Sequence, residues 1–231
     1  MKNIGIIVIV IVVLGLGYYM FKGDKASPLA ENPETASEEP VLAVPFGSGK
    51  FTADSNASIL RWTGKKTLVP GWEDSGTIKL ISGDVSVSDG ILVESTFVID
   101  MGSIEAETTG MGKNESMLTT HLKSADFFDV EKYPTSQFSI TGILPTEDVA
   151  GYLVSGNLTL KGKTNPIIFP ITIVEDGSSI RMSGVSVVDR TQFDVRFGSG
   201  KFFQNLGDAL IDDEFTLKLD IVGTILEENL E

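Results

Sequence analysis

From Phe46 to the end of the 231-residue chain, apolar and polar residues alternate with a period of two. In residues 215–221 the apolar side chains fall on one face and the polar side chains on the other, and residues 157–161 and 137–141 repeat the pattern. Successive side chains of a β-strand point to opposite faces, so each such run predicts a half-buried strand. The number of runs predicts an all-β fold, with about eight to ten strands in one antiparallel sheet.

Turn residues separate the predicted strands. The pairs Gly83-Asp84, Asp89-Gly90 and Asp176-Gly177 are typical turn signals. Residues 167–174 are partly apolar on both faces, which predicts a strand covered on its outer side. Pro170 lies within this strand and has no N–H to donate, so we expect an edge, a bulge or irregular pairing there.

One short helix is expected to interrupt the strands. Asn114 is a favourable N-cap, and Met117, Leu118, His121 and Leu122 follow at the spacing of one helix face. The sequence favours a helix that plugs or flanks the sheet. A gate at the mouth of a barrel is a second interpretation of the same segment.

The N-terminus predicts a membrane segment. Between Ile4 and Phe21 the chain carries no charge over about 18 residues, or ~27 Å of helix, which is close to the thickness of a hydrocarbon core. Aromatic residues at its end and Lys22 fit a membrane boundary. We therefore expect a retained single-pass anchor in residues 1–22. A cleavable signal peptide is the alternative, because 15–17 reads Gly-Leu-Gly.

Residues 23–45 predict a flexible linker before a domain at 46–231. Four prolines and several glutamates recur in this stretch while large apolar residues are sparse, so it cannot bury enough surface to offset its ordering entropy. A chain of about this length has a reach of ~25 to 30 Å. An anchored domain would stay close to the bilayer.

Composition excludes several classes of function. A formal net charge of −14 disfavours nucleic acid and anionic lipid surfaces as partners. The chain has no cysteine and a single histidine, His121, which disfavours thiol chemistry, a His-cluster metal site and a Ser-His-Asp triad. We expect no catalytic residue, no metal site and no cofactor.

Several motifs follow one another along the predicted domain. They are Trp62-Thr63-Gly64, His121-Leu122-Lys123-Ser124, Asp126-Phe127-Phe128-Asp129, Tyr133-Pro134, Leu158-Thr159-Leu160-Lys161-Gly162 and residues 189–198. In this order they resemble the YceI-like family over roughly residues 51–224. The resemblance implies a lipocalin-like β-barrel that holds a long isoprenoid or similar lipid, and a binder rather than a catalyst. One departure is residues 68–74, where many relatives carry a histidine after the W-x-G motif.

With this resemblance, the inward side chains are expected to line a lipid cavity. Alternation alone is equally satisfied by a core filled with side chains, so both interpretations stay open. His121 and Arg190 are candidates for a polar rim, and Arg190 either pairs with Asp126 or Asp129 or meets a polar head group. The predicted apolar lining consists of Trp62, Phe97, Ile99, Leu122, Phe127, Phe128, Phe138, Ile140, Leu158, Leu160, Phe169, Ile171, Phe215, Leu217 and Leu219.

The sequence therefore predicts a membrane-anchored, extracytoplasmic barrel that binds, stores or transports a polyisoprenoid or an isoprenoid quinone. If the N-terminal segment is cleaved, the domain would instead be secreted or periplasmic. One alternative is a surface-anchored structural or adhesive β-domain with a filled core and no ligand. Another is an enzyme that acts on a lipid or envelope substrate, for which the sequence offers no cluster of polar residues.

Overall fold

The computed structural model describes residues 48–66, 68–88, 91–110, 114–146 and 151–227. The anchor and linker predicted within residues 1–45 lie outside these ranges. Within them, none of the helices is long and apolar enough to span a bilayer.

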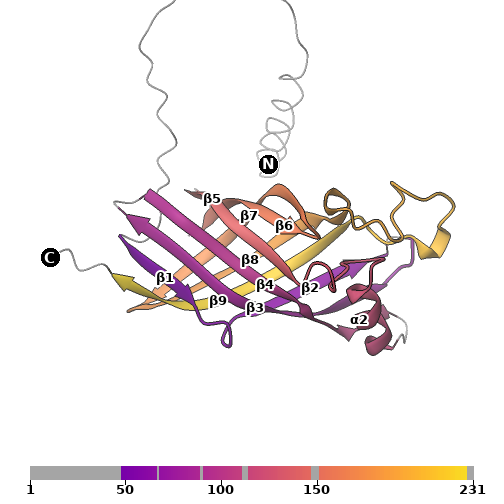
Figure 1. The fold of residues 1–231 in the computed structure, drawn as a ribbon, viewed down its shortest axis with the longest axis horizontal. Helices are drawn as coiled ribbons and strands as arrows, with labels where there is room; N and C mark the ends of the chain where they lie inside the picture. Colours follow the sequence, from indigo (N-terminus) through magenta and orange to yellow (C-terminus); the bar gives the residue numbers. More distant parts are fainter. Residues whose placement is uncertain (1–47, 67, 89–90, 111–113, 147–150, 228–231) are drawn as a thin grey trace, which may run out of the picture. The chain divides into compact units, whose positions relative to one another are not determined.

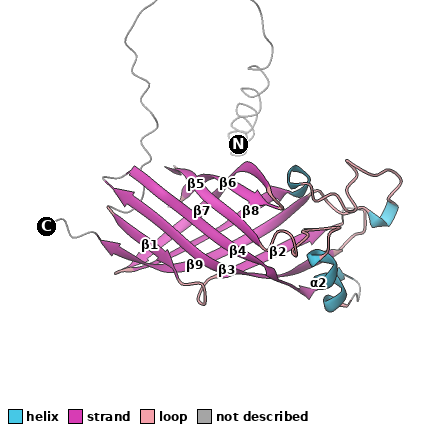
Figure 2. Cartoon of the chain, in the orientation of Figure 1, coloured by secondary structure: helices cyan, strands magenta, loops and turns pink. Residues whose placement is uncertain are grey.

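The described residues form one antiparallel sheet with a short helix and two 3₁₀ turns (Figures 1 and 2). Alternating burial along the strands, as in β6, follows the alternation in the sequence. The elements are β1 (Gly49–Ala53), β2 (Ile59–Lys65), β3 (Glu73–Ser88), β4 (Ile91–Thr108), α2 (Glu115–Lys123), β5 (Thr135–Pro145), β6 (Tyr152–Leu160), β7 (Lys163–Asp176), β8 (Ser179–Asp189), η2 (Arg190–Phe193), η3 (Gly207–Ala209) and β9 (Glu214–Glu227).

The sheet closes into a barrel of eight strand positions. Its order is β1-β3-β2-β9-β8-β7-β6-β5-β4, and β3 also pairs with β4, which joins the two edges. Both β1 and β2 pair with β3 and β9, at different levels, so these two strands share one position. The break between them is a turn in which the Asp54 carboxylate accepts from the N–H groups of Asn56 and Ala57. The prediction of an all-β barrel of about eight strands is confirmed.

The two ends of the barrel differ. The connections β3–β4, β5–β6 and β7–β8 are hairpins at one end, which we call the hairpin end. Helix α2 and residues 190–213, between β8 and β9, lie at the other end, which we call the loop end (Figures 1 and 2).

Helix α2 forms where the sequence predicts a helix. The Asn114 side chain accepts from the Ser116 N–H and caps it, and the Thr119 hydroxyl accepts from the Ala106 N–H of β4 at 2.9 Å. Of the residues at the spacing of one helix face, Leu122 is buried, whereas Met117 is 73% exposed. The helix covers part of the loop end.

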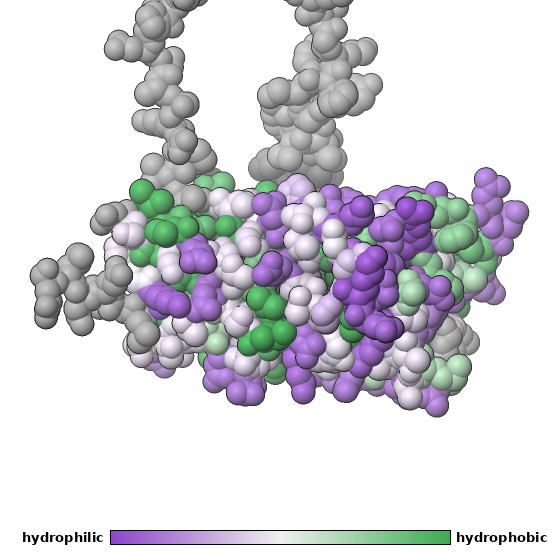
Figure 3. All heavy atoms as spheres, viewed as in Figure 1, coloured by the Kyte–Doolittle hydropathy of each residue, from purple (hydrophilic) through white to green (hydrophobic). Residues whose placement is uncertain are grey.

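The prediction that the outer side of β7 is covered is wrong. This face is uncovered among the described residues, because Ile168 is 60% exposed and Val174 is 58% exposed. Pro170 pairs in register with Leu153 of β6, whereas the ladder with β8 begins only at the next residue, so the irregular pairing expected at this proline is confirmed. Figure 3 shows one face of the molecule, on which apolar residues form patches among polar ones.

The pair Gly83-Asp84 is not a turn but lies inside β3. Gly83 is opposite Phe97 of β4, and a Cβ atom at Gly83 would lie 2.6 Å from the Phe97 ring. The glycine therefore makes room for an aromatic ring in the barrel.

The interior of the hairpin end is packed with side chains. Phe51 is fully buried and lies against Gly223 of β9, where a Cβ atom would come within 2.5 Å of the ring. Val85, Ile143 and Ile180 are also at most 3% exposed at this end. Packing of this density leaves free space only toward the loop end.

A candidate binding cavity inside the barrel

A cavity of about 460 Å³ occupies the barrel from its middle to the loop end. This volume lies within the range of small-molecule sites, roughly 300 to 1,000 Å³. Along β9 the lining runs from Glu214 to Ile221. Those seven steps span ~23 Å of strand, or ~18 Å along the barrel axis at the usual strand tilt.

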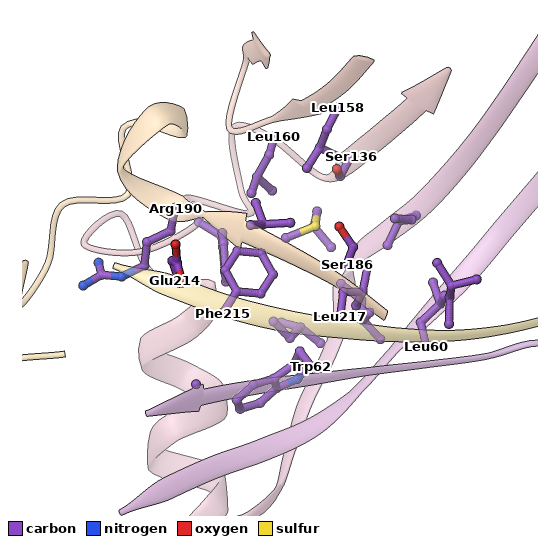
Figure 4. A pocket seen from close by; sticks show the side chains of 18 of the residues that line it. Leu60, Trp62, Ser136, Leu158, Leu160, Ser186, Arg190, Glu214, Phe215 and Leu217 are labelled. Atoms are coloured by element: carbon purple, nitrogen blue, oxygen red, sulfur yellow. The ribbon is translucent and has the colours of Figure 1, made fainter. Parts of the chain in front are cut away.

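Every residue predicted from the sequence to line a cavity does line this one, as do both predicted rim residues, His121 and Arg190. They come from six strands, from α2 with the turn that follows it, and from η2. Figure 4 shows several of them, including Trp62 on β2 and Phe215 on β9. Contact of these side chains with a ligand stays a prediction.

Sequence reasoning missed other lining residues. Several lie two positions from a predicted one on the same strand, as Leu60 does from Trp62, so the same period could have found them. Met101 and Ile104 are three residues apart in a stretch of β4 where the register with β3 shifts, and there the period fails. The missed apolar and sulfur-containing residues are Leu60, Ile78, Leu80, Met101, Ile104, Leu118, Val154, Ile167, Met182, Val188, Phe197, Ala209, Ile211 and Ile221.

The lining is apolar except for a few groups. The Trp62 indole N–H donates to the Glu105 carbonyl at 3.2 Å, and the Ser136 hydroxyl donates to the Thr159 carbonyl at 2.7 Å. The Ser186 hydroxyl also lines the cavity and has no hydrogen-bond partner. The filled-core alternative predicted no cavity, and the open space contradicts that part of it.

Aromatic rings cover the cavity next to α2. The His121 ring meets Phe127 edge-on at 5.1 Å and Phe197 at 4.4 Å between centroids, and the two phenyl rings are 5.6 Å apart. The Nε2 atom of His121 lies 4.0 Å from a carboxylate oxygen of Asp126. His121 is thus packed at the loop end between apolar rings and an exposed carboxylate.

Arg190 is almost completely buried, at 3% exposure, and its donors are occupied. Residues 194–213 fold back over its guanidinium, and their main-chain carbonyls accept its hydrogen bonds. Nε donates to Asp212 at 2.9 Å, Nη1 to Val195 at 2.9 Å and Phe197 at 2.8 Å, and Nη2 to Ile211 at 3.0 Å.

The predicted ion pair of Arg190 with Asp126 or Asp129 is wrong. The carboxylate near its guanidinium is Asp213, at 3.8 Å. Burial lowers the pKa of Arg190, and the carboxylate of Asp213 is the strongest of the nearby charges that oppose this shift. Arg190 therefore holds the loop segment onto the end of β8.

A second charged group links the same segment to η2. The Asp189 carboxylate caps η2 by accepting from the Thr191 N–H at 2.9 Å, and it pairs with Lys201 Nζ at 2.8 Å. Burial raises the pKa of Asp189, but hydrogen bonds from Lys201 and Thr191 outweigh it, so the net shift is downward. Lys201 also lies 3.6 Å from Asp213, and its own pKa is raised by its hydrogen bond to Asp189. These contacts fix the loop end.

Within the described ranges, no three His, Asp or Glu side chains come together in a way that would hold a metal ion.

Comparisons with known proteins agree on one family and one fold. The model of the YceI-like domain family matches residues 51–223. The crystal structure of BcnA from Burkholderia cenocepacia is 26% identical, has a TM-score of 0.57, and covers 74% of this chain and 99% of its own. A polyisoprenoid binding domain from Saccharophagus degradans has a TM-score of 0.53 over 76% of this chain and 98% of its own; at 16% identity it shows the fold alone.

The curated relatives match over shorter segments. A UPF0312 protein of Pseudomonas putida is 36% identical over 75 residues, which is 32% of this chain and 38% of the relative. A UPF0312 protein of Pseudomonas savastanoi is 30% identical over 110 residues, which is 45% of this chain and 56% of the relative. The chain thus spans well under two thirds of the length of these relatives.

Proposed function

Because the chain belongs to the YceI-like domain family, we propose that its barrel binds, stores or transports an apolar lipid of the polyisoprenoid or isoprenoid-quinone type. The observation that carries the proposal is the long apolar cavity inside the barrel. The similar fold of the Saccharophagus degradans domain, a polyisoprenoid binding domain, supports it. The proposal contains no chemical step.

The physical basis is desolvation. Each ligand CH₂ group that leaves water contributes ~0.8 kcal/mol. Association costs roughly 4 to 15 kcal/mol in lost translational and rotational freedom, so a ligand with only a few carbons gains too little to bind well. A plain apolar wall therefore selects for long apolar chains without specific contacts.

We further propose that this binding takes place at the outer face of the cell membrane. Residues 1–22 would anchor the chain, and the linker at 23–45, with a reach of ~25 to 30 Å, would keep the barrel near the bilayer. A lipid leaving the membrane would then have a short path to the cavity. If the N-terminal segment is cleaved, the same barrel would work as a secreted or periplasmic carrier.

Tryptophan fluorescence tests the binding proposal on the full-length chain. Trp62 lines the cavity, whereas Trp72, the other tryptophan, does not. In a Trp72→Phe background, a quinone with a short isoprenoid tail should quench Trp62 saturably, with one site per chain. Quenching that rises linearly without saturation, for this quinone and for quinones with longer isoprenoid tails alike, would contradict the proposal.

A matched variant separates cavity binding from surface effects. Leu158 lines the cavity on β6, and Leu158→Phe would place a larger side chain in the free space. Saturable quenching should weaken strongly in this variant, whereas Val174→Phe, on the exposed outer face of β7, should leave it unchanged.

A further inference from the structure

Ser186 is a buried polar group without a partner inside an otherwise apolar wall. It is 2% exposed and lines the cavity, and its Oγ atom makes no hydrogen bond. Among the described residues, the other buried side-chain atom in this state is an oxygen of Asp213, which faces the Arg190 guanidinium at 3.8 Å. An unpaired buried hydroxyl destabilises a protein, so a bound group that accepts its hydrogen bond would relieve that cost.

The register of β8 forces Ser186 to face inward. Ile180, Met182 and Val188 are buried at even positions, which places Ser186 on the same face, while Val185 and Val187 point outward at 46% and 53% exposure. Figure 4 shows the Ser186 hydroxyl projecting from β8 into the cavity. The strand thus presents valines to the outside and a serine to the apolar interior.

The position of Ser186 also gives a ligand an orientation. It lies three residues before the end of β8, or ~10 Å of strand from the loop end. The lining farther toward the hairpin end is apolar and includes Leu80, Met182 and Ile221. A head group at Ser186 would therefore leave the tail in the apolar part of the barrel.

The charged groups of the rim do not favour an anionic head group. Lys65 is 3.4 Å from Glu73, the Lys66 ammonium donates to the Asp208 carbonyl at 2.7 Å, and the donors of Arg190 are directed to carbonyls and Asp213. Three carboxylates also line the cavity at this end, those of Asp74, Asp212 and Glu214. A phosphate placed near Ser186 would lose its water and gain no cation in return.

We infer that the bound lipid carries an uncharged head group whose oxygen accepts a hydrogen bond from Ser186, as a quinone carbonyl does, and that a polyprenyl phosphate is disfavoured. The inference rests on the proposed function, since it assigns the head group of the ligand in the same cavity. In this complex the ligand is held mainly by burial of its apolar tail, and Ser186 adds one polar contact to its head group.

Three probes with the same isoprenoid tail test the head group on the full-length Trp72→Phe chain: a quinone, the hydrocarbon without oxygen and the monophosphate. Native mass spectrometry measures binding of each probe on its own, and Trp62 quenching by the quinone, with displacement by the other two, ranks their affinities. We expect the quinone to bind most tightly. Ser186→Ala should weaken it about 2- to 10-fold, the effect of one neutral hydrogen bond, and change the hydrocarbon by less than about 2-fold.

Two results would overturn the inference: equal changes for quinone and hydrocarbon in Ser186→Ala, or a phosphate that binds at least as tightly as the quinone. Failure of all three probes to bind would instead refute the proposed function. Ser199→Ala is the matched control, because Ser199 is fully buried, accepts from the Lys201 N–H and does not line the cavity. It should leave the preference among the probes unchanged.

The ligand-free protein provides a second readout. Removal of a hydroxyl that has no partner should leave the midpoint of urea unfolding of Ser186→Ala unchanged or higher. A clearly lower midpoint would show that the hydroxyl has a partner within the protein, and would count against its assignment to a ligand.

Discussion

Replacement of Arg190 by methionine should destabilise the barrel strongly. Methionine keeps an unbranched apolar stem but has no donor, so four main-chain carbonyls would lose their hydrogen bonds and Asp213 would lose its counter-charge. Breaking a buried pair by removing one partner costs about 3 to 5 kcal/mol. In a domain of this size each kcal/mol lowers Tm by roughly 2 to 4 °C, so Tm should fall by about 6 to 20 °C.

Thermal unfolding measures Tm and urea unfolding measures the free energy of unfolding, with Arg196→Met as the matched control in both. The Arg196 side chain is 57% exposed and pairs with Asp194 at the surface, so its loss should cost at most about 1 kcal/mol. Arg190→Lys should also destabilise, because one ammonium cannot reach four carbonyls. Adding Asp213→Asn to Arg190→Met should restore part of the free energy of unfolding, since it removes the unpaired carboxylate. If the free energies of unfolding of Arg190→Met and Arg196→Met differ by less than about 1 kcal/mol, the role assigned to Arg190 is refuted.

Three further predictions concern the core, pH and the cavity. Phe51→Ala, in the packed hairpin end, should lower the free energy of urea unfolding by about 3 to 5 kcal/mol. Phe215→Ala should lower it clearly less, because Phe215 borders existing free space. Equal decreases in the two variants would contradict a barrel that is packed at the hairpin end and open toward the loop end. The lowered pKa of Asp189 stabilises the fold above the ordinary carboxyl value of about 4, so this contribution is lost as pH falls through the lower folded-state pKa. Lys201→Met removes one of the groups that lower this pKa, so its urea midpoint should fall less than that of the natural protein between about pH 5 and 2. Plots of midpoint against pH that run parallel for the two proteins would contradict this. Leu158→Phe should cost less than about 1.5 kcal/mol in the ligand-free protein, because it enters open space; a larger loss would indicate that the wall is already closely packed.

The period of two was sufficient to predict the barrel and most of its inner face. Strands such as β6 and β9 alternate regularly, so their inward residues, including Leu158 and Leu217, follow directly from the sequence. The turn predicted at Gly83 was wrong because a glycine that makes room for the Phe97 ring looks the same in sequence as a glycine in a turn. Met101 and Ile104 were missed because β4 is irregular there.

The polar parts of the site depend on long-range contacts that the sequence does not display. In 185–187 the hydropathy pattern is inverted, with Ser186 inside and its two valine neighbours outside, and only the register set by the rest of β8 reveals it. The partners of Arg190 are main-chain carbonyls of residues 195–212, and carbonyl positions leave no signal in residue types. A nearby carboxylate was therefore the natural but mistaken prediction.

Native mass spectrometry of the chain tests lipid binding in the cavity most directly. We expect one tightly bound ligand per chain, with the mass of an uncharged isoprenoid lipid after release, and a much smaller bound fraction in Leu158→Phe. A chain that stays at its bare mass, even after incubation with isoprenoid quinones and polyprenyl lipids, would contradict it.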